Sequence, residues 1–167
     1  MSFDTTNGTR GARQPKGPLL KWMNSVMSWR ISRKGKAPGM PFDALVLVTI
    51  GAKSGEERRV PLGWFPSPGG GWLVVAAAAG APKNPAWYYN LAAHPDRVSV
   101  EIPRGSVPVR AEQLHGAERD QAWQQILSAA SQFAKYQMKT DRELPVIRLV
   151  ERLPASRRGP APGACAQ

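Results

Sequence analysis

The chain has 167 residues, 42% of them hydrophobic, which is enough for one domain with a buried core. Its sixteen Pro and sixteen Gly disfavour a helical bundle and favour a turn-rich β or α+β protein. The net charge is +11, but residues 1–39 carry eight Lys/Arg against one Asp and so hold +7 of it, which argues against a nucleic-acid-binding surface on the domain itself.

The N-terminal part divides into an arm and a helix. Residues 1–17 have no hydrophobic period, and we expect a disordered basic arm there. From Pro18 to Arg33 apolar residues recur at roughly helical spacing, and Gly35 and Pro38 end the pattern. Two interpretations of this amphipathic basic helix stay open. Its apolar stripe packs on the domain, or it lies on an anionic membrane surface.

The rest of the chain is rich in β-type runs. These are residues 44–50, 58–65, 72–77, 98–102, 107–114 and 145–150. A helix capped by Asn84 runs from Pro85 to about His94, and a second runs from Glu118 to Tyr136. The runs do not alternate as βαβ units, so a doubly wound sheet is disfavoured. We predict an α+β fold over residues 18–153, a small antiparallel barrel of about six to seven strands, with a flexible tail at 154–167.

A basic loop, 51–55, joins the first two runs and places Lys53 and Ser54 between two glycines. Glycines at both ends allow successive N–H groups to point inward and form a concavity suited to anions. The loop does not fit a Walker A motif, because Lys-Ser precedes the second glycine and a β-run follows. The alternative is a solvated hairpin tip, but Lys53, Arg58, Arg59 and Lys83 gather positive charge near two turns.

Three consecutive aromatic residues, Trp87, Tyr88 and Tyr89, follow in the inserted helix. Successive helix positions lie about 100° apart, so the three rings cannot share one face, and one or two of them pack inward. Loop and rings together indicate a site for a flat, aromatic, negatively charged ligand. No Ser-His-Asp or Cys-His motif is present, so an enzyme of this sequence would take its reactivity from a cofactor.

Other chemistries find little support in the sequence. The single cysteine, Cys165, permits no disulfide within the chain, which fits a reducing cytoplasm. His94 and His115 stand far apart without a CxxC pattern, so no metal site is expected. No apolar run approaches the roughly 20 residues of a membrane span.

Several motifs, in order, resemble the deazaflavin-dependent nitroreductase family. They are 47–55 with Arg58 and Pro61-Leu62, Val75-Ala76, 84–91, His94-Pro95, 98–100, Tyr136-Gln137, 140–142 and Pro145-Val146. The resemblance implies a split β-barrel that binds coenzyme F-420, an 8-hydroxy-5-deazaflavin. It also implies hydride transfer from the reduced coenzyme to an electron-poor acceptor, such as an enone, a quinone or a nitroaromatic.

The resemblance also assigns roles to residues. Lys53, Ser54 and Arg58 would hold the phosphate and carboxylate end of the coenzyme. The remaining cofactor contacts would come from Val60, Pro61, Leu62, Ala76, Ala77, Ala78, Lys83, Trp87, Tyr88 and Asn90. Tyr136 would face the substrate and steer it or donate a proton. Phe133, Ala130 and Met23 would complete the substrate site.

The sequence departs from the family pattern at two places. Ala78-Ala79 stands where Ser-Lys is common, so Lys83 or Arg59 would have to replace a cation. Ala130 and Phe133 stand where tyrosines are frequent, which leaves the acceptor open. Two further functions remain in view: an oxidoreductase using flavin mononucleotide on the same barrel, and a non-catalytic binder of deazaflavin or an apolar ligand. The sequence leaves monomer or homodimer open.

Overall fold

The computed structural model describes residues 3–13, 17–36 and 41–153, so the expected tail at 154–167 lies outside the described residues. The helices are α1 (Pro18–Lys34), the 3-10 turn η1 (Ala78–Gly80), α2 (Ala86–Ala93), α3 (Gly116–Ala129) and α4 (Gln132–Lys139). The strands are β1 (Ala44–Ile50), β2 (Glu57–Gly63), β3 (Phe65–Pro66), β4 (Trp72–Val75), β5 (Val98–Ile102), β6 (Gly105–Gln113) and β7 (Val146–Glu151).

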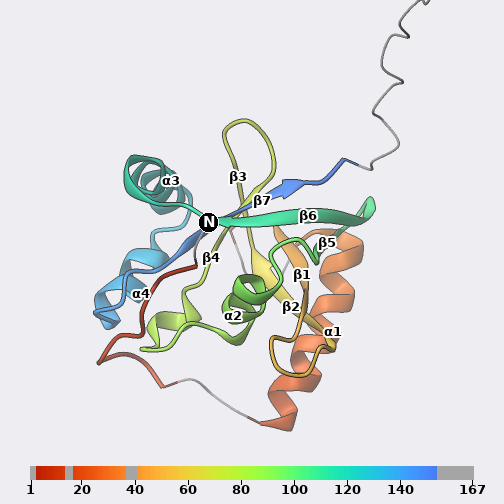
Figure 1. Ribbon diagram of the computed structural model, residues 1–167, viewed down its shortest axis with the longest axis horizontal. Helices are drawn as coiled ribbons and strands as arrows, with labels where there is room; N and C mark the ends of the chain where they lie inside the picture. Colours follow the sequence, from red (N-terminus) through yellow and green to blue (C-terminus); the bar gives the residue numbers. More distant parts are fainter. Residues whose placement is uncertain (1–2, 14–16, 37–40, 154–167) are drawn as a thin grey trace, which may run out of the picture.

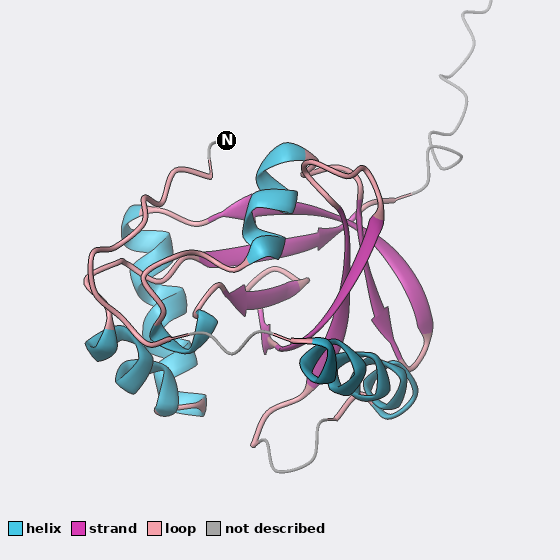
Figure 2. Cartoon of the chain, turned by 90° about the horizontal axis from the view of Figure 1, so that it is seen from below, coloured by secondary structure: helices cyan, strands magenta, loops and turns pink. Residues whose placement is uncertain are grey.

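All seven strands form one antiparallel sheet in the order β2-β1-β5-β6-β7-β4-β3. The sheet curls into a half-barrel, with α1 on one side and α3 and α4 on the other (Figure 1; Figure 2 shows the curl of the strands). The predicted α+β split barrel is confirmed. The edge strand β2 leaves main-chain N–H and C=O groups unpaired on its free side, available to a ligand.

Strand β1 is apolar along its length because both of its faces are covered. Leu45 and Leu47 belong to the barrel-interior cluster, while Val46 and Val48 pack with Ile31 of α1. Ile31 is 1% exposed, so α1 does pack on the domain through one stripe. Met23, Val26 and Trp29 of the same helix stay 50%, 42% and 59% exposed. No described helix has the length and apolar character needed to cross a membrane.

The predicted single helix 118–136 is two helices in the structure. Ala130 leaves helical geometry with φ −149° and ψ 81°, and α4 starts two residues later. The turn lets Ala130 and Phe133 bury themselves in the cluster formed with Phe65 and Leu73. Alanine is a strong helix former, so no local signal marks this break, and the tertiary contact of Phe133 with Phe65 decides it.

Residues 3–13, part of the arm expected to be disordered, lie against the domain in the structure and form hydrogen bonds with it. The Gly8 and Ala12 N–H groups donate to the Pro82 and Gly80 carbonyls at 2.7 and 2.9 Å. The arm therefore runs along the loop after β4, close to α4 (Figure 1). Gly8 and Gly11 permit this approach, since a methyl group on Gly11 would lie 2.4 Å from the Gly80 carbonyl oxygen.

Asp141 anchors the middle of the arm. Its carboxylate accepts hydrogen bonds from the Thr9 N–H (2.8 Å), the Thr9 hydroxyl (2.5 Å) and the Arg10 N–H (3.1 Å). These bonds, chiefly those from Thr9, lower the pKa of Asp141 from 3.8 to about 2. Because the folded pKa lies below the free value, the contribution to docking is complete above about pH 4 and is lost as the pH falls toward 2. The sequence gives no sign of this docking, because glycines and threonines show no period and the Asp141 acceptor of Thr9 lies 132 residues away.

Candidate functional site

A groove of about 1040 Å³ opens in the split between the edge strand β2 and the turn η1. Its floor and walls come from five elements. The lining residues include Thr49, Lys53, Ser54, Arg58, Arg59, Val60, Ala78, Ala79, Ala86, Trp87, Tyr89, Asn90 and Asn24 of α1. The groove is therefore mainly apolar along α2 and η1, and basic along the β1–β2 hairpin.

A buried amide fixes the hairpin loop against α2. The Asn90 side chain, 9% exposed, donates to the Thr49 hydroxyl and accepts from the Ala52 N–H, both at 3.0 Å. The Gly51, Gly55 and Glu56 N–H groups are also satisfied within the loop. Among the described residues, only the Lys53 and Ser54 N–H groups of this loop lack a partner. The predicted anion concavity is thus reduced to two N–H groups and the neighbouring side chains.

The basic side chains of the groove differ in how free they are. Arg58 pairs with Glu56 at 3.0 Å, and Arg59 pairs with Glu57 at 2.9 Å and with Glu101. Partial burial lowers the pKa of Arg59, but the hydrogen bonds to Glu57 and Glu101 outweigh this and raise it. In the part of the chain that the structure describes, Lys53 has no acidic partner, so it is the groove's uncompensated cation.

The wall opposite Lys53 has an unusual backbone. Ala78 and Ala79 adopt φ values of 47° and 54°. Left-handed geometry costs an L-residue about 1–2 kcal/mol, so something must hold these two alanines in place. The Arg142 guanidinium, in a residue only 2% exposed, donates to the carbonyls of Ala76, Ala77 and Ala81 at 3.0–3.2 Å and to Asn84 Oδ1 at 2.6 Å. Burial lowers the pKa of Arg142.

The residues around Arg142 explain the motif 140–142. The Gln137 side chain donates to the Arg142 carbonyl at 2.7 Å and accepts from the Leu144 N–H at 3.0 Å. The Thr140 hydroxyl accepts the Arg142 N–H at 3.2 Å. Asn84 was predicted to cap α2, which is wrong: it bonds Arg142 and the Thr5 carbonyl instead, and α2 starts at Ala86. The motif thus shapes the loop that borders the groove.

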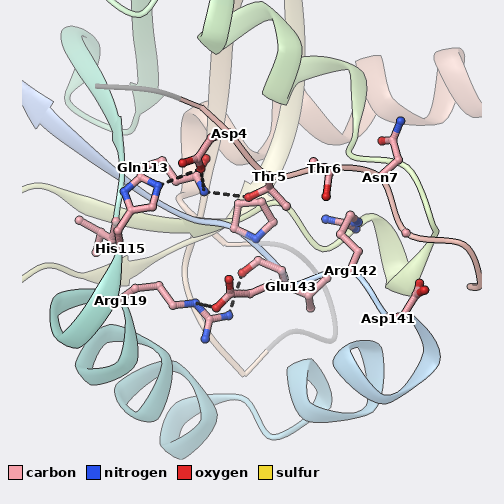
Figure 3. A pocket seen from close by; sticks show the side chains of 15 residues that line it. Asp4, Thr5, Thr6, Asn7, Gln113, His115, Arg119, Asp141, Arg142 and Glu143 are labelled. Atoms are coloured by element: carbon pink, nitrogen blue, oxygen red, sulfur yellow. Dashed lines mark hydrogen bonds and ion pairs between the residues drawn. The ribbon is translucent and has the colours of Figure 1, made fainter.

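A second cavity, about 540 Å³, lies between the arm and the barrel and is polar (Figure 3). Asp4 faces His115 at 2.9 Å, and the Gln113 side chain donates to the Thr5 hydroxyl at 2.8 Å. Arg119 donates to the Leu144 carbonyl at 2.9 Å and approaches Glu143 at 3.4 Å. Its lining of mixed charge, already engaged in contacts with the arm, offers neither an apolar surface nor a free cation cluster for a flat anionic ligand.

A sequence model described as F420H(2)-dependent quinone reductase matches residues 22–151. The chain belongs to this family. The resemblance derived from the motifs is confirmed, and the protein is an F-420-dependent reductase with coenzyme F-420 as its cofactor and a small-molecule acceptor.

Individual relatives agree with this membership. An F420H(2)-dependent quinone reductase of Mycobacterium tuberculosis is 34% identical over 137 residues, which cover 80% of this chain and 91% of the relative. A solved F420-H2 dependent reductase is 40% identical. The match covers 65% of this chain and 93% of the reductase chain, with a TM-score of 0.57. A structure described as a domain-swapped dimer is 36% identical, and the match covers 80% of this chain and 99% of that one, with a TM-score of 0.58.

The structure brings together seven of the residues predicted to bind the coenzyme. They are Lys53, Ser54, Arg58, Val60, Ala78, Trp87 and Asn90. Pro61 pairs with Val46, on the face of the sheet turned toward α1, and Leu62 packs into the barrel interior. Ala76 and Ala77 are buried and do not line the groove. Their carbonyls accept hydrogen bonds from Arg142, which fixes the loop that follows. Lys83 is exposed and does not line the groove.

Tyr88 turns away from the groove, and Tyr89 lines it instead. The Tyr88 hydroxyl donates to Gln113 Oε1 at 2.6 Å and accepts from the Thr5 N–H at 3.0 Å. Burial of this ring raises the pKa of Tyr88. Tyr89 is 41% exposed, and its hydroxyl donates to Asn7 Oδ1 of the arm at 2.8 Å. The three aromatic residues indicated the site, but the contacts with the docked arm determine that Tyr88 points away from the groove and that Tyr89 lines it.

None of the predicted substrate residues belongs to the groove lining, and Tyr136 is the one that lies beside η1. Ala130 and Phe133 are 4% and 8% exposed in the second core cluster. Tyr136 stacks edge-on against Phe133 with ring centroids 5.7 Å apart, and its backbone lies next to Gly80. Its ring is half-buried, and among the described residues no hydrogen-bond partner holds its hydroxyl. Met23 neighbours Asn24, the residue of α1 that does line the groove.

The residues present fit a deazaflavin with an anionic tail. Val60, Trp87 and Ala86 supply apolar surface for a flat ring, and the free edge of β2 supplies main-chain groups for its polar atoms. Lys53 and the Ser54 hydroxyl lie at the basic end, where the phosphate and carboxylates of the tail would be held. The groove's volume is at the upper end of the usual range for small-molecule sites, about 300–1000 Å³.

Proposed function

We propose that this protein reduces a quinone, with the coenzyme F-420 ring between Val60 and Trp87 and its tail on Lys53. The observation that carries the proposal is a groove whose apolar wall ends at an uncompensated cation. The family's description as quinone reductases favours a quinone over an enone or a nitroaromatic as the acceptor.

When bound, the reduced coenzyme supplies a hydride. A quinone that accepts the hydride also needs one proton to become a hydroquinone, so two electrons and two protons enter it in total. The protein's main contribution is to hold donor and acceptor at about 3–3.5 Å and to exclude water. The Arg142-held wall, Trp87 and the Asn90-fixed loop supply that rigidity.

Tyr136 is the proposed proton donor. It lies on α4 beside η1, so an acceptor that stacks on the ring from the η1 side would meet its free hydroxyl. General acid catalysis contributes about 10²–10⁴-fold to such a step. Phe133 packs edge-on against the Tyr136 ring and so fixes the orientation of that ring.

Replacing Lys53 should weaken coenzyme binding without unfolding the protein. We expect Lys53→Ala to raise the Kd of coenzyme F-420 about tenfold, measured by fluorescence titration, because the tail loses the groove's uncompensated cation. Lys34→Ala is the matched control, since Lys34 lies at the opposite end of β1, near Ala44. Equal Kd values for wild type and Lys53→Ala in a folded protein would reject the proposed binding mode.

Replacing Tyr136 should slow turnover while leaving coenzyme affinity unchanged. Tyr136→Phe keeps the ring packing on Phe133 and removes only the hydroxyl, so we expect kcat with a soluble quinone to fall by about 10²-fold or more. An unchanged kcat would show that another group or solvent supplies the proton.

We further propose that α1 contacts an anionic membrane surface through Met23, Val26 and Trp29. Arg30 and Arg33 are exposed on the same helix and would meet anionic headgroups. Asn24 of this helix lines the groove, so a lipid-soluble quinone would enter close to the coenzyme.

Flotation with anionic liposomes tests the membrane contact. We expect the wild type to float and the variant Met23→Ser/Val26→Ser/Trp29→Ser to stay in solution, because the three side chains supply the apolar surface. Met138→Ser is the control, since Met138 is 77% exposed on α4, away from α1. Equal flotation of all three proteins would remove the membrane proposal and leave the reductase proposal intact.

A further inference from the structure

The two walls of the coenzyme groove differ in charge. On the hairpin wall, Arg58 and Arg59 already have carboxylate partners, and Lys53 has none among the described residues. The opposite wall consists of Ala78, Ala79 and Ala86 and carries no charge. A ligand with a phosphate and several carboxylates would therefore meet one free cation in the groove itself.

The N-terminal arm passes directly beside the uncharged wall. The Ala12 N–H donates to the Gly80 carbonyl at 2.9 Å, and Gly80 follows Ala79. Gly11 packs so closely on this turn that a side chain there would collide with the Gly80 carbonyl. Docking of the arm thus fixes the chain one residue before Arg13, at the edge of the groove.

Arg13 is a basic residue at that edge. It is exposed, and in the part of the chain that the structure describes it makes no ion pair. Three methylene groups carry its guanidinium, so it can extend past Gly80 to the mouth of the groove. Arg10 is fixed differently, because its backbone N–H is held by Asp141 on the far side of the turn.

We propose that Arg13, delivered by the docked arm, is a second cation for the anionic tail of the coenzyme. A guanidinium binds phosphate or carboxylate through two parallel N–H bonds, and its charge does not depend on pH in the physiological range. The tail would lie between Lys53 on one wall and Arg13 on the other. This inference rests on the proposed function and adds the arm to the binding site.

Two probes separate the tail from the ring. One is coenzyme F-420 with its phosphate and glutamate tail, and the other is the deazaflavin riboside that lacks both. Fluorescence titration of Arg13→Ala should show about tenfold weaker binding of the tailed coenzyme, which corresponds to about 1.4 kcal/mol, and an unchanged Kd for the riboside. Arg152→Ala removes the same charge at the opposite end of β7 and should bind both probes as the wild type does.

A double-mutant cycle tests whether the docked arm delivers the charge. Gly11→Val keeps every charge but separates the arm from Gly80, and Asp141→Ala removes the anchor of Thr9. Each should weaken tailed-coenzyme binding by a factor similar to that of Arg13→Ala. Combining either with Arg13→Ala should give little further loss, because the changes remove the same contact.

The possible failures are distinguishable. If the wild type binds the tailed coenzyme and Arg13→Ala binds it equally well, the arm proposal is wrong and the reductase proposal stands. If Lys83→Ala loses the affinity instead, Lys83 is the second cation and Arg13 is not. Should the wild type bind neither probe, the proposed function itself fails, and this inference fails with it.

Discussion

The buried guanidinium of Arg142 is the constraint on which the groove depends. Its donors satisfy the carbonyls of Ala76, Ala77 and Ala81 around two left-handed alanines. A charged group in such a site is retained only where several acceptors compensate its desolvation, and here they all belong to one short loop and Asn84. That loop closes the open side of the half-barrel opposite β2, so the width of the coenzyme groove follows from this one side chain.

Adjacent residues of the 140–142 motif act in opposite directions. Arg142 points inward and holds the loop, whereas Asp141 points outward and holds the arm that runs over the same loop. Asn84 joins the two sides, because it accepts from Arg142 and donates to the Thr5 carbonyl of the arm. The arm, the loop and the start of β7 therefore form one hydrogen-bonded unit beside the groove. A substitution in any one of them should change the position of the others.

Much of the architecture could be predicted because it is encoded locally. The apolar run of β1 and the alternation in β6 each carry their own signal. What could not be predicted depends on partners distant in sequence. The break at Ala130 is set by the contact of Phe133 with Phe65, and the docking of the arm is set by Asp141.

The site shows the same division. Lys53, Arg58 and Trp87 were predicted from residue type and motif, and they line the groove. The choice of Tyr89 over Tyr88 was not predictable, because it depends on Gln113 and Thr5 binding the Tyr88 hydroxyl. The role of Arg142 was also hidden. A single arginine in a β-rich sequence gives no sign that it will be buried among carbonyl oxygens.

The most direct test replaces Arg142 by methionine, which keeps most of the side-chain volume and removes every donor. We expect Arg142→Met to lower the free energy of unfolding by about 3 kcal/mol and also to weaken binding of the tail-free deazaflavin riboside. Arg119→Met is the control. Arg119 is also a buried arginine, 9% exposed, but it donates to the Leu144 carbonyl rather than to the loop, so Arg119→Met should lose stability without losing riboside affinity. A folded Arg142→Met protein that binds the riboside as tightly as the wild type would show that Arg142 does not shape the coenzyme groove.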